Sequence, residues 1–437
     1  MRFVEKSSTL VELCLRRAHS DPEGRVYTFL EDGEREQGSL TFAELDARAR
    51  AIGAHLQRLG AAGERALLLY PAGLDYVAAF FGCLYAGVTA VPVYPPSRTR
   101  PTPRLRSIVA DARPTLALTD AGHLADVERL CLHTPELSAL RWVGTDTLPP
   151  EEAEGWTPPA ISGSTLAFLQ YTSGSTSAPK GVMVSHGNLL HNSSLLERFS
   201  GSTPRSRSVI WLPPYHDMGL IGGLLQPLYT GYEAILFSPV AFIQRPMRWL
   251  EAISRYGATI SGGPNFAYDL CVRKSTPEDR AALDLGAWNF AFNGAEPVRH
   301  ETLRAFAEAF APAGFRPETF FPCYGLAEAT LIVTGGAREA EPVLLSVDGD
   351  ELAHDRALPV AADQPGARTL VGSGRSAADQ RVRIVDPETR MERPAGTVGE
   401  IWVSGPSVAG GYWERDEATE HAFGGFLSGS GEGPFLR

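Results

Sequence analysis

The chain has 437 residues, of which 43% are hydrophobic and 21% are charged. These proportions are typical of a packed globular protein and exclude wholesale disorder, and at about 150 residues per domain the length allows two or three folding units. Lys and Arg number 40 against 51 Asp and Glu, a net charge of −11. So acidic a chain is a poor candidate for nucleic-acid binding, which requires a basic surface.

The five cysteines are odd in number and widely spaced, and no CxxC pair occurs among them. This pattern disfavours a disulfide framework or a zinc site, and a cytoplasmic location is expected. The first residues, MRFVEKSS, lack the apolar stretch of a secretory signal. A long uncharged and mainly apolar stretch, residues 76–94, is interrupted by two glycines and a proline. We therefore predict a buried helix followed by a strand there, in preference to a membrane span.

The first element predicted with a clear start is an amphipathic helix that begins at a capping box, Thr41 to Glu44. Apolar residues recur on one face of this helix before the stop signal Gly60: they are Leu45, Ile52, Leu56 and Leu59. A strand over residues 66–70, a helix over about 75–85 and a strand over 88–93 are predicted next. Apolar strands that alternate with helices predict a parallel sheet covered on both faces.

The same alternation continues along the chain. Further strands are predicted at Thr115–Thr119, Thr165–Gln170, Ser208–Leu212, Glu233–Phe237, Ala258–Ser261 and Trp288–Phe292. Helices between them are predicted at Asn188–Phe199, Pro246–Tyr256 and Val298–Phe310. After about Gly336 the sequence becomes β-rich, with strands predicted at Val343–Val347, Arg381–Val385 and Glu400–Ser404. The last two are expected to pair antiparallel in a smaller subdomain.

The strongest local signal is the loop Tyr171–Gly181, which follows an apolar strand. It combines hydroxyls, backbone N–H groups and one lysine, as polyphosphate binding requires. The candidate phosphate-binding residues are Thr172, Ser173, Gly174, Ser175, Thr176 and Lys180. The loop is not a Walker A motif, because Pro179 and Gly181 occupy positions where that motif needs Gly and Ser or Thr. A flexible surface loop is the alternative interpretation.

This loop resembles the phosphate loop of the adenylate-forming superfamily, and further motifs of that superfamily follow in order. Asn293-Gly294-Ala295-Glu296-Pro297 resembles the turn that lies along adenine. Tyr324-Gly325-Leu326-Ala327-Glu328 resembles the aromatic-Gly-x-x-Glu motif. Gly399–Val403 and Gly410–Trp413 resemble the structural motif near the end of the large domain.

A narrower resemblance is to the fatty acyl-AMP ligases. Trp211–Gly222, which contains Pro214-Tyr215-His216-Asp217, is similar to their signature, and residues 342–374 resemble their insertion. One departure is Ser373, where the family often has Cys before Gly-Arg. The resemblance implies an α/β fold in which two stacked β-sheets with helices are joined by a smaller β-rich subdomain.

The same resemblance implies that residues 1–437 form the large AMP-binding N-terminal domain. Its subdomains would be roughly residues 1–175, 176–336 and a β-rich 337–437. A small C-terminal domain, which carries a catalytic lysine in that family, is expected to lie outside this chain.

The resemblance implies a role in catalysis or ATP binding for residues of several of these motifs, and the chemistry of adenylation explains why those residue types suit it. Adenylation gathers negative charge on phosphoryl oxygens, so Lys180 and the loop hydroxyls would stabilise it. Glu328 and Thr176 would hold Mg²⁺ through hard oxygen ligands. ATP would also contact two motif segments: Asn293, Gly294, Ala295 and Glu296, and Tyr324, Gly325, Leu326 and Ala327. Tyr324 would offer a flat face to adenine. His216 would orient the carboxylate and later the incoming thiol; His216, Lys180 and Glu328 are thus the expected catalytic residues.

A helix predicted over residues 217–229 has almost no polar face and is expected to be buried on all sides. It is interpreted either as core or as one wall of an acyl tunnel, with Phe266 and Tyr268 opposite. The expected substrate-contacting residues are Tyr215, His216, Met218, Gly219, Leu220, Gly222 and Phe266. Asp217 is interpreted as the acidic cap of this helix or as a functional residue.

The expected reaction is ATP-dependent activation of a medium- or long-chain fatty acid to acyl-AMP. The acyl group would then pass to the phosphopantetheine thiol of an acyl carrier protein or a carrier domain of a polyketide or peptide synthase. The insertion at 342–374 is the reason for preferring a carrier over free CoA. A fatty acyl-CoA ligase and a non-catalytic adenylate-binding module remain alternatives. A hydrolase and a dehydrogenase are disfavoured, because neither GxSxG nor a GxGxxG after a strand occurs.

Overall fold

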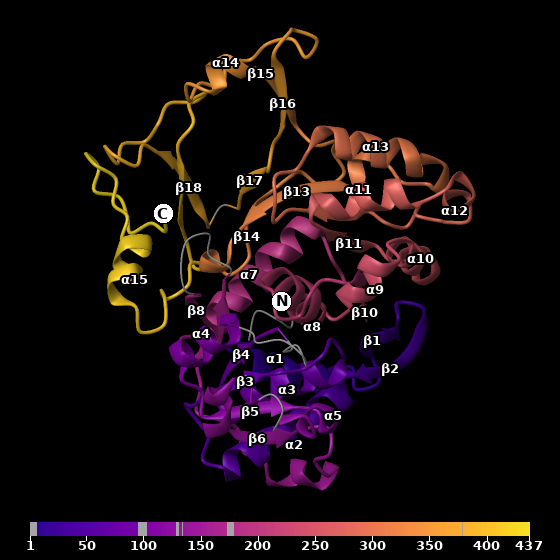
Figure 1. The fold of residues 1–437 in the computed structure, drawn as a ribbon, viewed down its shortest axis with the longest axis vertical. Helices are drawn as coiled ribbons and strands as arrows, with labels where there is room; N and C mark the ends of the chain where they lie inside the picture. The colour runs from indigo at the N-terminus through magenta and orange to yellow at the C-terminus, as the bar shows by residue number, and fades with distance from the viewer. Residues whose placement is uncertain (1–6, 95–102, 128–130, 133, 173–178, 378) are drawn as a thin grey trace.

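The computed structural model describes residues 7–94, 103–127, 131–132, 134–172, 179–377 and 379–437. These residues form two large β-sheets with helices packed on them and a smaller β-rich region (Figure 1). The expected α/β architecture is confirmed. None of the helices in this part of the chain is long and apolar enough to cross a membrane.

The smaller of the two large sheets has six strands in the order β6-β5-β3-β4-β7-β8. They are β3 (Arg65–Leu68), β4 (Thr89–Pro92), β5 (Leu116–Thr119), β6 (Arg141–Gly144), β7 (Leu166–Tyr171) and β8 (Gly181–Ser185). β8 runs antiparallel to β7, and all other pairs are parallel. The sequence predicted this parallel sheet but missed β6 and β8.

The larger sheet has nine strands in the order β17-β14-β13-β12-β11-β9-β10-β1-β2. They are β1 (Arg25–Glu31), β2 (Arg35–Thr41), β9 (Arg207–Ile210), β10 (Glu233–Phe237), β11 (Ile260–Gly263), β12 (Phe290–Asn293), β13 (Phe320–Gly325), β14 (Ile332–Gly335) and β17 (Arg375–Ser376). The strands from β1 to β13 are parallel, and antiparallel strands close both edges.

Sheet membership does not follow the order of the chain. The hairpin β1–β2 lies in the larger sheet although it precedes the whole smaller sheet, because β1 pairs in parallel with β10. Conversely, β8 belongs to the smaller sheet although it follows residue 175. The expected division near residue 175 therefore does not coincide with the boundary between the sheets.

The helices cover both sheets. They are α1 (Leu10–Ser20), α2 (Phe42–Arg58), α3 (Leu74–Ala86), α4 (Pro103–Ala112), α5 (Ala121–Leu124), α7 (His186–Ser200), α8 (Gln226–Thr230), α9 (Pro239–Gln244), α10 (Met247–Tyr256), α11 (Asn265–Lys274), α12 (Pro277–Ala281), α13 (His300–Phe310), α14 (Gly349–Leu352) and α15 (Asp416–Phe423). The predicted capping box of α2 is present: Thr41 Oγ1 accepts the Glu44 N–H, and the Glu44 carboxylate accepts the Thr41 N–H.

The two large sheets share one apolar core, which includes side chains from strands of both. Helix α3 lies between them: it is buried from Tyr76 to Ala86, and Val77 borders a small void together with Phe29 and Leu236 of the larger sheet. This confirms the predicted buried helix in the uncharged stretch. The core fixes the positions of β7, β9 and β12, after which the candidate site segments follow in the chain.

The segment predicted as a helix over 217–229 is helical, but its first part, Met218–Leu225, is a π-helix that continues into α8. A Cβ added at Gly219 would collide with the Pro213 carbonyl oxygen, and one at Gly223 would lie 2.7 Å from Ile210 Cγ2. Glycine at these two positions therefore lets the wide helix pack directly against β9 and the loop after it.

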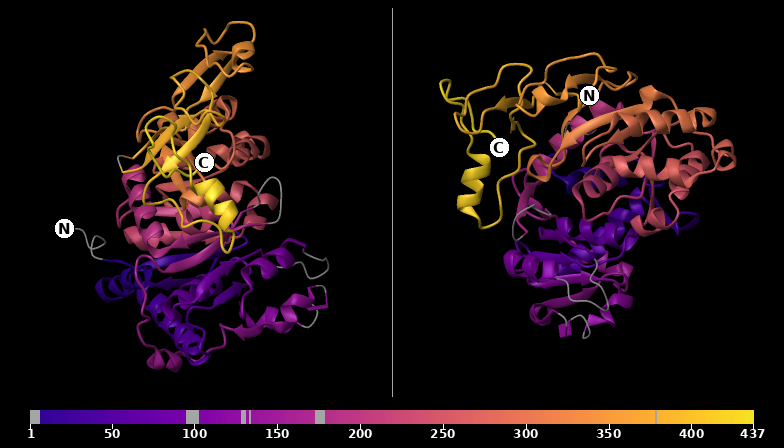
Figure 2. Two further views of the ribbon diagram at one scale, coloured as in Figure 1. Left: turned by 90° about the vertical axis from the view of Figure 1, so that its left-hand side faces the viewer. Right: turned by 45° about the horizontal axis from the view of Figure 1, so that its top comes forward.

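The β-rich region lies beside the larger sheet (Figure 2). It contains the hairpin β15 (Leu344–Asp348)–β16 (Ala367–Val371) and the pair β18 (Arg381–Val385)–β19 (Glu400–Ser404). The predicted antiparallel pair is confirmed, with Val382 opposite Val403 and Ile384 opposite Ile401. Residues 342–374, the expected insertion, contain the β15–β16 hairpin, and α14 lies in the segment that connects its two strands. This hairpin reaches the top of Figure 1.

Candidate active site

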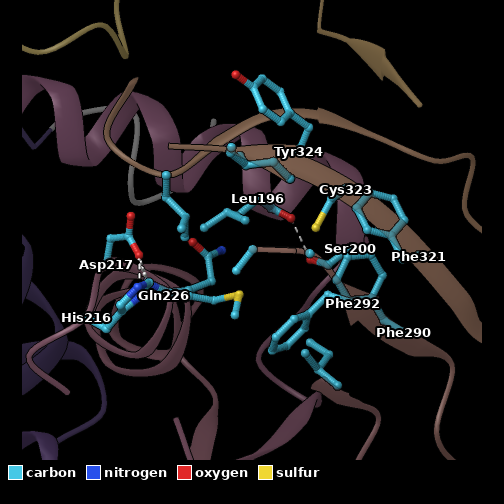
Figure 3. A pocket seen from close by; sticks show the side chains of 18 of the residues that line it. Leu196, Ser200, His216, Asp217, Gln226, Phe290, Phe292, Phe321, Cys323 and Tyr324 are labelled. Atoms are coloured by element: carbon cyan, nitrogen blue, oxygen red, sulfur yellow. Dashed lines mark hydrogen bonds and ion pairs between the residues drawn. The ribbon is translucent and has the colours of Figure 1, made fainter. Parts of the chain in front are cut away.

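Two cavities of different character meet at one histidine. A cavity of about 250 Å³ and a wider pocket of about 670 Å³ both border His216 and Asp217. The first is lined mainly by aliphatic and aromatic side chains that point into it from the larger sheet and α7 (Figure 3); we call it the apolar cavity. The second, the polar pocket, includes Gln170, Thr172 and Glu328. His216 therefore stands where an apolar chain and a polar group could meet.

Asp217 holds the ring of His216. The His216 Nδ1 lies 2.6 Å from Asp217 Oδ1, which also accepts the Met218 N–H at 2.7 Å. Asp217 thus caps the π-helical segment, as one interpretation expected, and also pairs with the histidine; a functional role for Asp217 stays a prediction. The Asp217 carboxylate raises the pKa of His216, because it accepts a hydrogen bond from the ring and stabilises its charged form. With Nδ1–H donated to Asp217, Nε2 is the ring nitrogen available to a ligand.

Lys180 and Glu328, far apart in sequence, are brought together by Tyr412. The Lys180 Nζ lies 4.7 Å from the centre of the Tyr412 ring, and the Tyr412 hydroxyl donates to Glu328 Oε1 at 2.8 Å. Burial and the neighbouring Glu328 raise the pKa of Tyr412, which therefore stays a hydrogen-bond donor. Of the predicted phosphate loop, Thr172 borders the polar pocket. Ser173, Gly174, Ser175 and Thr176 lie outside the described residues.

Tyr412 reaches this position because its segment pairs with β8. The Met183 N–H donates to the Gly411 oxygen, and the Trp413 N–H donates to the Gly181 oxygen. On the other side, the Ala409 N–H donates to the backbone oxygen of Glu328. Gly410–Trp413 is expected from the sequence to be a structural motif, so Tyr412 is a site residue that the sequence did not predict. The only signal in the sequence was that this motif, Gly410–Trp413, contains a tyrosine, whose hydroxyl can hydrogen-bond a carboxylate.

The carboxylate of Glu328 suits Mg²⁺. The Tyr412 hydroxyl occupies only one of its oxygens, and Mg²⁺ is usually bound by one or two carboxylates together with water and substrate phosphates. Among the residues that the structure describes, there is no group of three or more His, Cys, Asp and Glu that could hold a metal by itself. This donor set fits a cation shared with a nucleotide. The other expected ligand, Thr176, lies outside the described part.

The expected adenine-binding turn follows β12 and packs on β13. Ala295 has a φ of +67°, and a Cβ added at Gly294 would lie 2.9 Å from the Cys323 oxygen. The Glu296 carboxylate accepts the N–H of Phe266 at 2.6 Å, at the start of α11. The side chain of Asn293 is fully buried.

Of the two predicted nucleotide segments, residues 293–296 border the apolar cavity, and residues 324–328 border both cavities. Gly294, Ala295, Tyr324 and Gly325 border the apolar cavity, whereas Leu326, Ala327 and Glu328 border the polar pocket. Their roles in nucleotide binding stay predictions.

The apolar cavity differs in part from the predicted acyl tunnel. His216, Met218 and Gly222 border it, and Tyr215 borders the polar pocket instead. Gly219 and Leu220 are buried in the packing against neighbouring segments. Two further side chains do not form the opposite wall: Phe266 is 40% exposed and contacts Trp211, and Tyr268 is buried beside Trp288. α11 turns these rings away from the cavity.

The opposite wall comes from elements that the sequence does not predict to be neighbours. It includes Leu196 of α7, Phe290 and Phe292 of β12, and Phe321 and Cys323 of β13 (Figure 3). Burial raises the pKa of Cys323 to about 12, so the thiol is uncharged and compatible with an apolar occupant.

Comparison with known proteins agrees with this geometry. The family model "AMP-binding enzyme" matches residues 15–413. The chain is 45% identical to the medium-chain-fatty-acid–[acyl-carrier-protein] ligase JamA of Moorena producens, over 98% of this chain and 74% of the relative. It is 39% identical to the long-chain-fatty-acid–AMP ligase FadD23 of Mycobacterium tuberculosis, over 95% of this chain and 73% of the relative.

Among solved structures, the fatty acyl-adenylate ligase from Legionella pneumophila in complex with acyl adenylate and pyrophosphate is similar. Its TM-score is 0.94 at 42% identity, and the match covers 100% of this chain and 75% of that one. The chain therefore belongs to the AMP-binding enzyme family, and within it to the fatty acyl-AMP ligases. It is an enzyme that activates fatty acids with ATP.

Proposed function

We propose that this chain condenses a medium- or long-chain fatty acid with ATP to give acyl-AMP and pyrophosphate. The acyl group then passes to the phosphopantetheine thiol of an acyl carrier protein or of a carrier domain in a polyketide or peptide synthase. The observation that carries this proposal is the meeting of the apolar cavity and the polar pocket at His216. The carrier as acceptor is supported by the name of the similar JamA ligase.

The acyl chain lies in the apolar cavity and its carboxylate lies at His216. The raised pKa of His216 favours the charged ring, whose Nε2–H donates to one carboxylate oxygen and aligns the other. That oxygen attacks the α-phosphorus, and the bond from this phosphorus to the pyrophosphate oxygen breaks. Lys180 stabilises the negative charge that gathers on the phosphoryl oxygens. Glu328 would hold Mg²⁺ together with the phosphates, and the ion would supply further charge neutralisation there when bound.

The polar pocket is also the proposed route of the thiol. Tyr94, Arg104 and Tyr215 border it beside His216, so an arm that enters past these residues reaches the carbonyl carbon of the adenylate. The thiol gives up its proton to water as its sulfur bonds to that carbon, and AMP leaves with the bonding electrons of its oxygen. We also propose a cytoplasmic location, which is supported by the five cysteines, all of them free.

Two measurements test the proposal. The first is pyrophosphate release with ATP and saturated acids of increasing length. Each buried CH₂ contributes about 0.8 kcal/mol, so kcat/KM is expected to rise with chain length until the cavity is full. A preference for acetate, an amino acid or an aromatic acid over dodecanoic acid would contradict the substrate class. The second compares a phosphopantetheinylated carrier protein with CoA as acceptor; faster thioester formation with CoA would favour the alternative, a fatty acyl-CoA ligase.

A further inference from the structure

The apolar cavity holds a buried amide for which the proposed reaction has no use. Gln226 lies at the junction of the π-helical segment and α8, is 4% exposed, and borders the cavity. In Figure 3 its amide stands among the apolar side chains of the lining. The Nε2 donates to Thr230 Oγ1 at 3.0 Å, whereas Oε1 has no hydrogen-bond partner among the described residues.

An unpaired amide in this position is unfavourable unless a ligand pairs with it. Burial has removed its water, and a plain alkyl chain offers it neither a donor nor an acceptor. The bond to Thr230 uses only one of the two N–H groups, so the amide retains one donor and one acceptor. The terminal torsion of a glutamine is broad, so rotation about it can present either group to the cavity.

The chemistry of the cavity selects the kind of group that would pair with Gln226. A charged amine or carboxylate is unfavourable beside Gln226, because the wall is mainly apolar and the two charged residues of the lining, His216 and Asp217, already pair with each other. A ketone can only accept a hydrogen bond. A hydroxyl both donates and accepts, and it therefore satisfies the amide in either orientation. The other small polar group of the lining, the Ser200 hydroxyl, already donates to the Leu196 oxygen.

We propose that the preferred acyl substrate carries a hydroxyl group on its chain and that Gln226 is the residue that selects it. This inference rests on the proposed function, because it names the substrate class of the same cavity. Sites built to bind a substrate hydroxyl discriminate strongly against the analogue without it, whereas apolar pockets distinguish such pairs weakly. Gln226 therefore acts as a specificity-determining residue.

The experiment measures kcat/KM for pyrophosphate release with ATP and a positional series: dodecanoic acid and its monohydroxy isomers. In the parent protein, one isomer or two adjacent isomers are expected to be favoured over dodecanoic acid by roughly tenfold or more, because only a hydroxyl at the right depth reaches Gln226. In Gln226→Leu this preference is expected to disappear. Activity with the favoured isomer would fall about tenfold, while activity with dodecanoic acid would be retained or rise.

A matched control is Gln57→Leu, which removes another glutamine amide, bonded to the Thr157 oxygen at 2.7 Å and remote from the cavity. It should leave the ratio between hydroxylated and plain acid unchanged. If Gln226→Leu does not fold, Gln226→Met replaces it, because methionine keeps the length of the side chain without the amide. The comparison of the acids in the parent protein tests the inference without any variant.

Two results would overturn the inference: a parent protein that uses dodecanoic acid at least as well as every isomer, or a hydroxyl preference that survives in Gln226→Leu. In both cases acids are still adenylated, and the proposed function stands. Absence of pyrophosphate release with every acid would instead refute the proposed function.

Discussion

Replacing Tyr412 with Phe tests a single contact of Glu328, the proposed Mg²⁺ ligand. The substitution removes the hydroxyl that donates to Glu328 Oε1 at 2.8 Å. It keeps the aromatic ring, whose centre lies 4.7 Å from the Lys180 Nζ, so the cation–π contact remains. Any change in activity therefore reports on the orientation of Glu328.

The size of the effect follows from the kind of hydrogen bond. A bond to a charged group contributes about 1.5–3 kcal/mol, and because Glu328 is only half-buried the lower end applies. About 1.5 kcal/mol corresponds to roughly a tenfold change in an equilibrium constant. Loss of a partner that orients a ligating carboxylate weakens metal binding on the same scale. We expect the Mg²⁺ concentration for half-maximal rate to rise about tenfold, with a smaller change in rate at saturating Mg²⁺.

The assay is pyrophosphate release across a Mg²⁺ titration at saturating ATP and dodecanoic acid. Tyr256→Phe is a matched control, because Tyr256 also donates to a glutamate, Glu36 Oε1, at 2.8 Å but lies on the surface away from both cavities. It should leave the titration unchanged. A Tyr412→Phe titration that coincides with that of the parent would refute a role for this contact in cation binding.

Three further predictions concern the same site. Lys180→Ala should slow adenylation by about a hundredfold, as removal of one preorganised donor does elsewhere, and a loss below twofold would rule out the assigned phosphate contact. Asp217→Asn removes the carboxylate that raises the pKa of His216, so the ring loses its proton at lower pH. In a pH profile of KM for the fatty acid, the rise in KM at alkaline pH should therefore shift to lower pH. An unshifted profile would contradict the pairing of Asp217 with His216. Gly219→Ala should lower the free energy of unfolding by about 1–3 kcal/mol in a denaturant titration, because the added Cβ overpacks the helix. Gly222→Ala should be as stable as the parent, because its added Cβ has no neighbour nearer than 3.6 Å, and it should prefer shorter acids. Equal stabilities of the two variants would contradict this reasoning.

The sequence predicted the parts of the site that depend on local pattern. Lys180, His216 and Glu328 each lie in a short motif whose residue types suit one task, and the structure places them around the two cavities or beside Tyr412. Strands such as Glu233–Phe237 were predicted to the residue, because a continuous apolar run bounded by turns is distinctive.

The remaining features depend on which distant segments meet. Phe266 was assigned to the acyl wall from its sequence context, but the direction of a ring on α11 is set by tertiary packing. Phe290 and Phe321 line the cavity because β12 and β13 are neighbours, which the order of the chain does not state. The β1–β2 hairpin carried a readable signal, Asp32-Gly33, a turn typical of hairpins. It was missed because β2 is mostly exposed and polar.

The apolar core shared by the two large sheets has a consequence for how the molecule unfolds. Ala66 and Phe168 of the smaller sheet and Ile235 and Phe237 of the larger sheet belong to a single buried cluster. Opening either sheet alone would also expose apolar surface that the other sheet buries against it, so a state with only one sheet intact is unfavourable. The two sheets should thus melt as one cooperative unit. The β15–β16 hairpin, with Leu344 46% and Leu345 42% exposed, lies outside this cluster and can open while the two sheets stay together.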